Sequence, residues 1–136
     1  MPGISIFIAM SLKADYIDIS RFKNSKHFCS YLRTAPKVDR SNKTNHITGL
    51  NKNSRKLSLS LLIQGLPHFY TSNTYLSQYR KKKMQGKAAG RVRIAMARKL
   101  LSILYVMLKR KELYRYSLPV GYARKLEELE KLKKTA

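Results

Sequence analysis

Acidic residues are scarce in this chain of 136 residues, in which 7 Asp+Glu stand against 29 Lys+Arg and give a formal net charge of +22. A compact chain with this excess of positive charge repels itself, which predicts a polyanionic partner. Nucleic acid is the first candidate, and an anionic membrane surface is the second. The imbalance is sharpest over residues 77–111, where all twelve charged residues are basic: Arg80, Lys81, Lys82, Lys83, Lys87, Arg91, Arg93, Arg98, Lys99, Lys109, Arg110 and Lys111.

Cysteine, glycine, proline and long apolar runs are also few. Cys29 is the only cysteine, which excludes an internal disulfide and a cysteine-based zinc site and predicts a buried small hydrophobe. The 6 Gly and 4 Pro exclude a collagen-like or linker composition. The longest apolar stretches, residues 4–10 and 100–108, fall far short of the roughly 20 residues that a bilayer requires. With no signal-peptide pattern at the start, these features predict a cytoplasmic protein.

Apolar periodicity favours helices almost throughout. A chain of this length with a hydrophobic fraction of 43% can bury a core. We expect helices over residues 4–12, 26–32, 54–64, 73–84, 91–109 and 122–134, with Ser25 capping the second and Gly86 and Gly90 preceding the fifth. The alternating apolar residues at 4–8 and 57–63 also fit a strand. Residues 36–53 form the longest polar stretch and are expected to be a functional loop. The prediction is an all-α or nearly all-α compact domain at 1–116, followed by a charged helix at 117–136.

The scattered carboxylates and histidines do not predict a metal centre in this chain. Magnesium chemistry requires a cage of oxygen ligands, and histidine ligands need a characteristic spacing. Neither pattern is present in the candidate residues, which are Asp15, Asp18, Asp39, His27, His46 and His68. We therefore expect this chain to bind no metal ion or organic cofactor, and we expect each carboxylate to be solvated or paired with a basic side chain.

A serine in the polar stretch is the candidate nucleophile. Nearby cations lower the pKa of a serine hydroxyl and neutralise the charge that develops when it attacks phosphorus. Ser41 has such neighbours in Arg33, Lys37, Arg40 and Lys43. A turn or capping role is the commoner one for a serine in a basic loop.

Tyrosines alternate with the basic residues: Tyr75, Tyr79, Tyr105, Tyr114, Tyr116 and Tyr122. Aromatic rings can stack on exposed bases, while the cations contact phosphates. The alternative is that Tyr75, Tyr79 and Tyr105 pack in the helical core with their hydroxyls at the surface, and we expect this second arrangement for those three.

Several short motifs occur in an order typical of a known family. The opening Met1-Pro2-Gly3-Ile4-Ser5 is similar to the Ile-Pro-Gly-Ile-Gly start of a helix-hairpin-helix element. Other matching stretches are Arg21-Phe22-Lys23, Tyr31-Leu32, Pro36, Ser41 five residues later, Ala97-Arg98-Lys99-Leu100-Leu101, and Tyr114 or Tyr116. Together they resemble the C-terminal domain of the insertion-sequence (IS) 110/116/902 transposases. The chain departs from the family glycines at Ser5, Arg33 and Asn42, and residues 51–56 match only loosely.

The resemblance implies part of a two-part DNA recombinase in bacteria, working at the nucleoid. In the family, an N-terminal RuvC-like domain carries metal-binding carboxylates, for which Mg²⁺ is implied. A serine of the C-terminal domain forms a covalent link with DNA, a structured RNA of the element takes part, and protomers pair. By this resemblance Ser41 is the nucleophile. From charge and proximity, the expected nucleic-acid contacts are Arg33, Lys37, Arg40, Lys43, Arg55, Lys81, Lys82, Lys83, Arg91 and Arg93.

The sequence begins inside the hairpin motif, which suggests a truncated or decayed transposase gene, or a start placed too far downstream. We expect this fragment to bind DNA or RNA without recombining DNA by itself. The alternative is a small non-catalytic protein that binds RNA or the nucleoid. Both predict binding that weakens steeply with salt, so the salt dependence does not separate them. A covalent DNA adduct, or a carboxylate domain encoded upstream, would. A membrane-surface helix over residues 91–110 is disfavoured, because Leu101 and Leu104 suit the core better.

Overall fold

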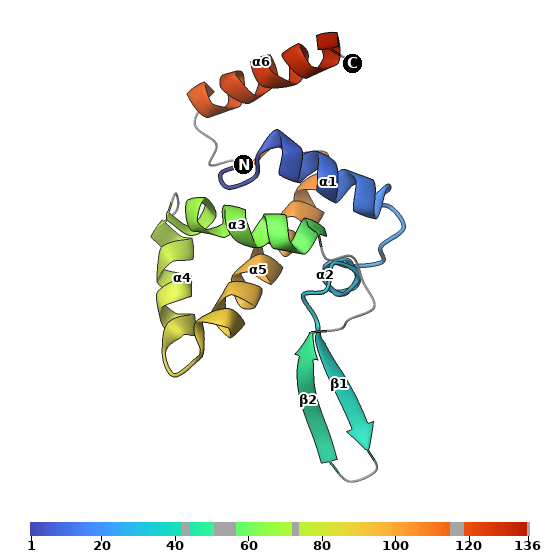
Figure 1. Cartoon of the computed structure of the whole chain (residues 1–136), viewed down its shortest axis with the longest axis vertical. Helices are drawn as coiled ribbons and strands as arrows, with labels where there is room; N and C mark the ends of the chain where they lie inside the picture. The colour runs from blue at the N-terminus through green and yellow to red at the C-terminus, as the bar shows by residue number, and fades with distance from the viewer. Residues whose placement is uncertain (42–43, 51–56, 72–73, 115–118, 136) are drawn as a thin grey trace.

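The computed structural model describes the backbone of residues 1–41, 44–50, 57–71, 74–114 and 119–135, and it describes side chains in these ranges except at 36–41, 44–50, 74, 119–122 and 135. Helices account for most of this part of the chain (Figure 1). They are α1 (Ile6–Tyr16), α2 (Ser25–Tyr31), α3 (Leu57–Thr71), α4 (Thr74–Met84), α5 (Ala89–Arg110) and α6 (Pro119–Thr135). The prediction of a nearly all-α domain is confirmed.

The segment expected to be a polar loop is instead largely a β-hairpin. Strand β1 (Pro36–Ser41) pairs with strand β2 (Thr44–Leu50) in antiparallel register, with Val38 opposite Ile47 and Ser41 opposite Thr44. The prediction of a loop was wrong because it weighed the polar residues and passed over the β-branched ones. Val, Ile and Thr favour extended backbone, and they occur at Val38 in β1 and at Thr44, Ile47 and Thr48 in β2. Figure 1 shows the hairpin extending away from the helices just after α2.

The core lies where α2, α3 and α4 pack against α5, and α1 covers α3. From α5 it takes Ala97, Leu100 and Leu101, all fully buried. Phe28 of α2 is also fully buried, and its ring meets the Phe22 ring edge-on with the centroids 5.2 Å apart. The predicted burial of Cys29 is confirmed. The repeat of apolar residues at three and four along α5 is therefore the seam that holds the domain together.

The chain enters the core through a glycine contact. Ile4 N–H donates to Met1 O across a turn with Pro2 second and Gly3 third, and Gly3 has φ 73°. These are the features of a type II turn. A Cβ on Gly3 would lie 2.2 Å from the Gly65 carbonyl oxygen of α3, and a Cβ on Gly65 would lie 1.9 Å from the oxygen of Gly3. Both positions therefore require glycine for the turn to reach α3.

Two helix boundaries differ from those predicted. The N-cap of α2 is Asn24 rather than Ser25, because the Asn24 side-chain oxygen accepts a 2.9 Å hydrogen bond from the His27 N–H. Asparagine and serine cap helices about equally well, so the sequence alone does not show which of these two adjacent residues is the N-cap. Gly86 has φ 66° and lies in the turn before α5, whereas Gly90 lies within the first turn of α5. The break before α5 therefore depends on Gly86 alone.

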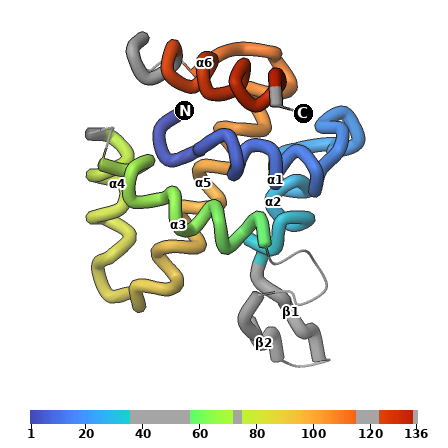
Figure 2. Tube along the Cα trace, turned by 45° about the horizontal axis from the view of Figure 1, so that its top comes forward, coloured from blue at the N-terminus to red at the C-terminus, as the bar shows by residue number. Residues whose placement is uncertain are grey.

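Helix α6 lies against α1 and the N-terminal turn (Figure 2). The Lys125 Nζ donates to the carbonyl oxygens of Met1 at 2.8 Å and Ile4 at 2.7 Å. Burial of the ammonium group lowers the pKa of Lys125 from its usual value. In the ranges described above, no helix combines the length and the apolar character needed to cross a membrane.

Candidate nucleic-acid interface

The candidate nucleophile ends strand β1. Ser41 is the last residue of that strand and is paired with Thr44, at the outer end of the hairpin that Figure 1 shows extending from the helices. Lys37 and Arg40 belong to the same strand. Of the other cations expected around Ser41, Lys43 and Arg55 lie outside the described residues. The hairpin therefore carries the serine and two predicted phosphate contacts on one short strand.

The base of the hairpin is fastened to the core by groups that sequence reasoning did not single out. The Thr34 hydroxyl donates to Cys29 O at 2.7 Å, and its side chain is fully buried. From α5, the Arg98 Nε donates to Thr34 O at 3.1 Å, and a second guanidinium nitrogen donates to the same oxygen. A hydrogen bond from a charged donor is stronger than a neutral one. Arg98, which the sequence shows as one of twelve cations and as part of a family-like stretch, thus ties the hairpin to α5.

Arg33 occupies a strained position immediately before this junction. It has φ 62°, and its N–H donates to Ser30 O while the Thr34 N–H donates to Cys29 O. This pair of bonds is the Schellman arrangement that ends a helix, and glycine is the usual residue at the left-handed position. The substitution of Arg33 for the family glycine therefore falls at the one residue of this turn with a positive φ.

The remaining predicted contacts gather on the α4–α5 pair. Lys81, Lys82 and Lys83 form the last turn of α4, where Lys81 and Lys82 are exposed and Lys83 is half-buried. Arg91 and Arg93 are exposed on the first turns of α5. The turn at Gly86 joins the end of α4 to the start of α5 (Figure 1). The three lysines and the two arginines therefore lie at the same end of the α4–α5 pair.

Aromatic rings accompany the cations on α4. Tyr75 is 61% exposed and Tyr79 is half-buried. The Lys99 Nζ of α5 lies 5.8 Å from the centroid of each ring, and the Lys83 Nζ lies 5.5 Å from that of Tyr79. The prediction that Tyr75 belongs to the core was wrong, because the buried residue of this turn is Leu76, which fixes the rotation of α4.

Tyr105 behaves as predicted in one respect and not in another. It is buried in the core, as expected. Its hydroxyl donates to Phe22 O at 2.9 Å within the protein instead of reaching the surface. A buried tyrosine hydroxyl needs such a partner, since leaving it unpaired costs free energy.

The two acidic residues nearest the N-terminus differ in their surroundings. Asp15 is buried on α1, while Asp18 is exposed in the following turn. Hydrogen bonds from the Ser20 hydroxyl and N–H lower the pKa of Asp18. Among the described residues, no group of three His, Cys, Asp or Glu side chains is placed to hold a metal ion.

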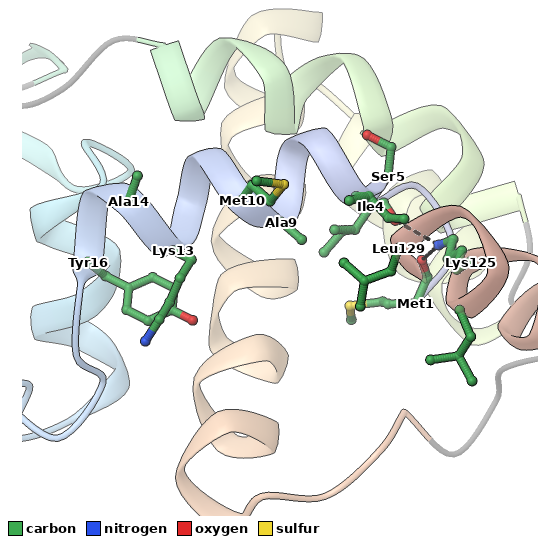
Figure 3. A pocket seen from close by; sticks show the side chains of 12 residues that line it. Met1, Ile4, Ser5, Ala9, Met10, Lys13, Ala14, Tyr16, Lys125 and Leu129 are labelled. Atoms are coloured by element: carbon green, nitrogen blue, oxygen red, sulfur yellow. Dashed lines mark hydrogen bonds between the residues drawn. The ribbon is translucent and has the colours of Figure 1, made fainter. Parts of the chain in front are cut away.

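An apolar groove lies apart from these basic residues. A groove of about 680 Å³ runs between α1 and α6, and it is lined mainly by apolar side chains, among them Ile4, Ala9, Met10, Leu126 and Leu129. Figure 3 shows Lys125 reaching from α6 across one end of this groove to the N-terminal turn. The described cations predicted to bind nucleic acid lie elsewhere, on α4, on α5, on β1 and, at Arg33, in the turn before β1.

Comparisons with known proteins support the resemblance read from the motifs. The model of the transposase IS116/IS110/IS902 family matches residues 1–80, from the N-terminal turn to most of α4. The transposase for insertion sequence element IS1111A of Coxiella burnetii is 26% identical over 119 residues, which are 85% of this chain and 33% of that protein. The chain thus spans about a third of the length of this relative. No solved structure matches the chain.

Proposed function

Since the chain belongs to the transposase IS116/IS110/IS902 family, we propose that it binds insertion-sequence DNA and carries in Ser41 the nucleophile for DNA strand transfer. One observation carries the proposal: the family match runs through the whole hairpin, and Ser41 stands at the outer end of strand β1. A group at the end of a projecting hairpin is accessible to a phosphodiester of a bulky duplex.

The chemistry is a transfer of a phosphoryl group to serine. The Ser41 Oγ forms a bond to phosphorus, the bond from phosphorus to one deoxyribose oxygen breaks, and that oxygen leaves with a proton. The product is a phosphoserine diester that conserves the energy of the original link. Cations that neutralise the developing charge would assist, and Lys37 and Arg40 are on the same strand. The Mg²⁺ of the family is expected at carboxylates of the RuvC-like domain, and no step here depends on it.

Binding is proposed to come from phosphate contacts along two basic regions. One is the hairpin with Arg33 at its base, and the other is the α4–α5 pair with Lys81, Lys82, Lys83, Arg91 and Arg93. Lys and Arg side chains that neutralise phosphates release counterions and give salt-sensitive affinity. Residues 1–116 would form the DNA-binding unit and 117–136 an appended helix. A second protomer and an RNA of the element are further expected partners.

The nucleophile is tested with an activated substrate. An oligonucleotide ending in a 4-nitrophenyl phosphodiester supplies a good leaving group, so the chain's own serine is sufficient for the first step. We expect a covalent adduct, with peptide mapping placing it on Ser41, and no adduct with Ser41→Ala. Ser20→Ala, which changes an exposed serine far along the chain from the hairpin, is the matched control. An adduct on another residue, or none, would contradict the assignment of Ser41.

A specific observation favours a second candidate, in which the chain binds nucleic acid without cleaving it. Two family glycines around the hairpin are replaced, by Arg33 at the positive-φ position and by Asn42 next to Ser41. This candidate predicts full DNA affinity by fluorescence anisotropy together with the absence of any adduct. Binding and adduct formation are therefore measured on the same preparation.

A further inference from the structure

Four side chains at the edge of the molecule combine exposed aromatic surface with positive charge. They are Tyr75, Tyr79 and Lys83 of α4 and Lys99 of α5, named here the stacking platform. Figures 1 and 2 both show α4 at the edge of the helical body, with α3 and α5 on its inner side. Leu76 is buried beneath, so α4 cannot turn its Tyr75 ring inward without removing Leu76 from the core.

The arrangement of the platform matches what an unpaired base requires. A base presents a flat π-face, and aromatic side chains with nearby cations bind such faces and the adjoining phosphates. The Tyr75 ring is 61% exposed. The Lys99 Nζ lies 5.8 Å from the centroid of each ring, and the Lys83 Nζ lies 5.5 Å from the centroid of Tyr79. Each ring is thus next to an ammonium group that can reach a phosphate of the same strand.

We propose that the stacking platform binds single-stranded nucleic acid by stacking an unpaired base on the exposed Tyr75 ring, while Lys83 and Lys99 contact the phosphates and the half-buried Tyr79 ring positions Lys99. The proposal rests on the proposed function in that the chain binds nucleic acid. It adds a second site, separate from Ser41, and a ligand class that phosphate contacts alone do not define. In a duplex the faces of the bases are covered by their neighbours, so the Tyr75 ring discriminates between paired and unpaired strands.

The experiment compares three fluorescent ligands of about 12 nucleotides, a length within the site sizes of single-strand binders. They are oligo-dT, an abasic chain with the same phosphates, and a duplex hairpin. For the wild-type chain we expect oligo-dT to bind more tightly than the abasic chain by about tenfold, the order of one stacked base. Tyr75→Leu removes the ring but keeps an apolar side chain, and we expect it to abolish this difference and leave abasic and duplex binding unchanged.

Two control variants test whether the ring of Tyr75 causes the preference for oligo-dT. Tyr75→Phe keeps the ring and is expected to bind oligo-dT like the wild type. Phe7→Leu removes a ring that is 66% exposed on α1, away from the platform, and is also expected to bind like the wild type. Lys99→Gln should weaken oligo-dT and the abasic chain to the same extent, because it acts on phosphates. Circular dichroism melting of each variant shows that it is folded.

The outcomes separate the platform from the proposed function. If Tyr75→Leu leaves the preference for oligo-dT over the abasic chain intact while the duplex still binds, the platform is wrong and the proposed function stands. If the wild type binds none of the ligands, the proposed function itself fails. A fourth ligand, oligo-U, distinguishes RNA from DNA. Equal affinity for oligo-dT and oligo-U supports recognition of the bases alone. A preference for oligo-U that Tyr75→Leu does not change would overturn stacking as the basis of recognition.

Discussion

The pairs α4–α5 and α1–α6 lie on different sides of the same core and have opposite chemistry. The α4–α5 pair exposes cations and tyrosine rings, whereas the α1–α6 pair encloses an apolar groove, and α6 carries three of the seven acidic residues, Glu127, Glu128 and Glu130. Figure 1 shows α6 at one end of the molecule and the hairpin at the other. The net charge of +22 is thus not spread evenly, and its distribution indicates which side faces a polyanion.

The largest effect is expected from neutralising the end of α4. Changing Lys81, Lys82 and Lys83 together to Gln should weaken duplex DNA binding about 100-fold at physiological salt and lower the slope of log K against log salt by about 3, because three phosphate contacts are lost. The matched control neutralises three cations at the end of α6, Lys131, Lys133 and Lys134. Anisotropy titrations at several salt concentrations give both quantities. Equal losses in the two triple variants would show that charge acts without regard to position.

The next largest effect concerns the base of the hairpin. Arg98→Ala removes the charged donor from Thr34 O, and we expect it to lower the free energy of unfolding by about 1.5–3 kcal/mol. Lys99→Ala, the neighbouring cation on α5, should change it by less than about 0.5 kcal/mol. Urea denaturation followed by circular dichroism measures both. Similar values for the two variants would show that Arg98 does not anchor the hairpin.

Two glycine substitutions contrast the two sides of the core. Gly65→Ala forces a methyl group against the Gly3 carbonyl oxygen, and we expect it to destabilise the chain by about 1–3 kcal/mol. Gly90→Ala meets no atom within 4 Å and lies in the first turn of α5, so it should stabilise the chain by about 0.5–1 kcal/mol. Thermal melts of the two variants should shift in opposite directions. A gain for Gly65→Ala would mean that the N-terminal turn does not pack on α3.

The smallest expected effect comes from restoring glycine at position 33. Arg33→Gly relieves the left-handed backbone at φ 62° and should stabilise the chain by up to about 1 kcal/mol. The same variant removes one predicted phosphate contact, so DNA affinity should fall while stability rises. Chemical denaturation and anisotropy on the same samples test this opposition. A loss of stability would show that the contacts of the Arg33 side chain outweigh the backbone strain.

The helical core could be predicted from sequence because its signal is local and repeated. Phe28 and Leu32 are one turn apart and both are fully buried, and the α5 residues at spacings of three and four form the seam. The hairpin was missed because its stability comes from cross-strand pairing, which local polarity does not report. Helix α3 was predicted to end at Gln64, yet it continues through Pro67 to Thr71, where the Thr71 hydroxyl donates to Pro67 O at 2.7 Å.

The candidate site was only partly predictable. Ser41 and Lys81–Lys83 can be found from the sequence, because basic residues are concentrated around them. Arg98 and Tyr75 do not, because their roles depend on tertiary neighbours: Thr34 lies 64 positions away from Arg98, and Lys99 reaches Tyr75 from another helix. No periodicity within a single helix specifies such contacts. Only the burial of Leu76 beside it explains why Tyr75 is exposed.

The central claim is that nucleic acid lies on α4–α5 and the hairpin and leaves α6 free. The most direct measurement is a titration of the isotope-labelled chain of 15.8 kDa with a short DNA duplex, followed by amide chemical shifts. The account predicts shifts concentrated at residues 33–41, 81–83 and 91–93, with residues 124–134 unchanged. Shifts of equal size along α6, or shifts confined to it, would contradict the account.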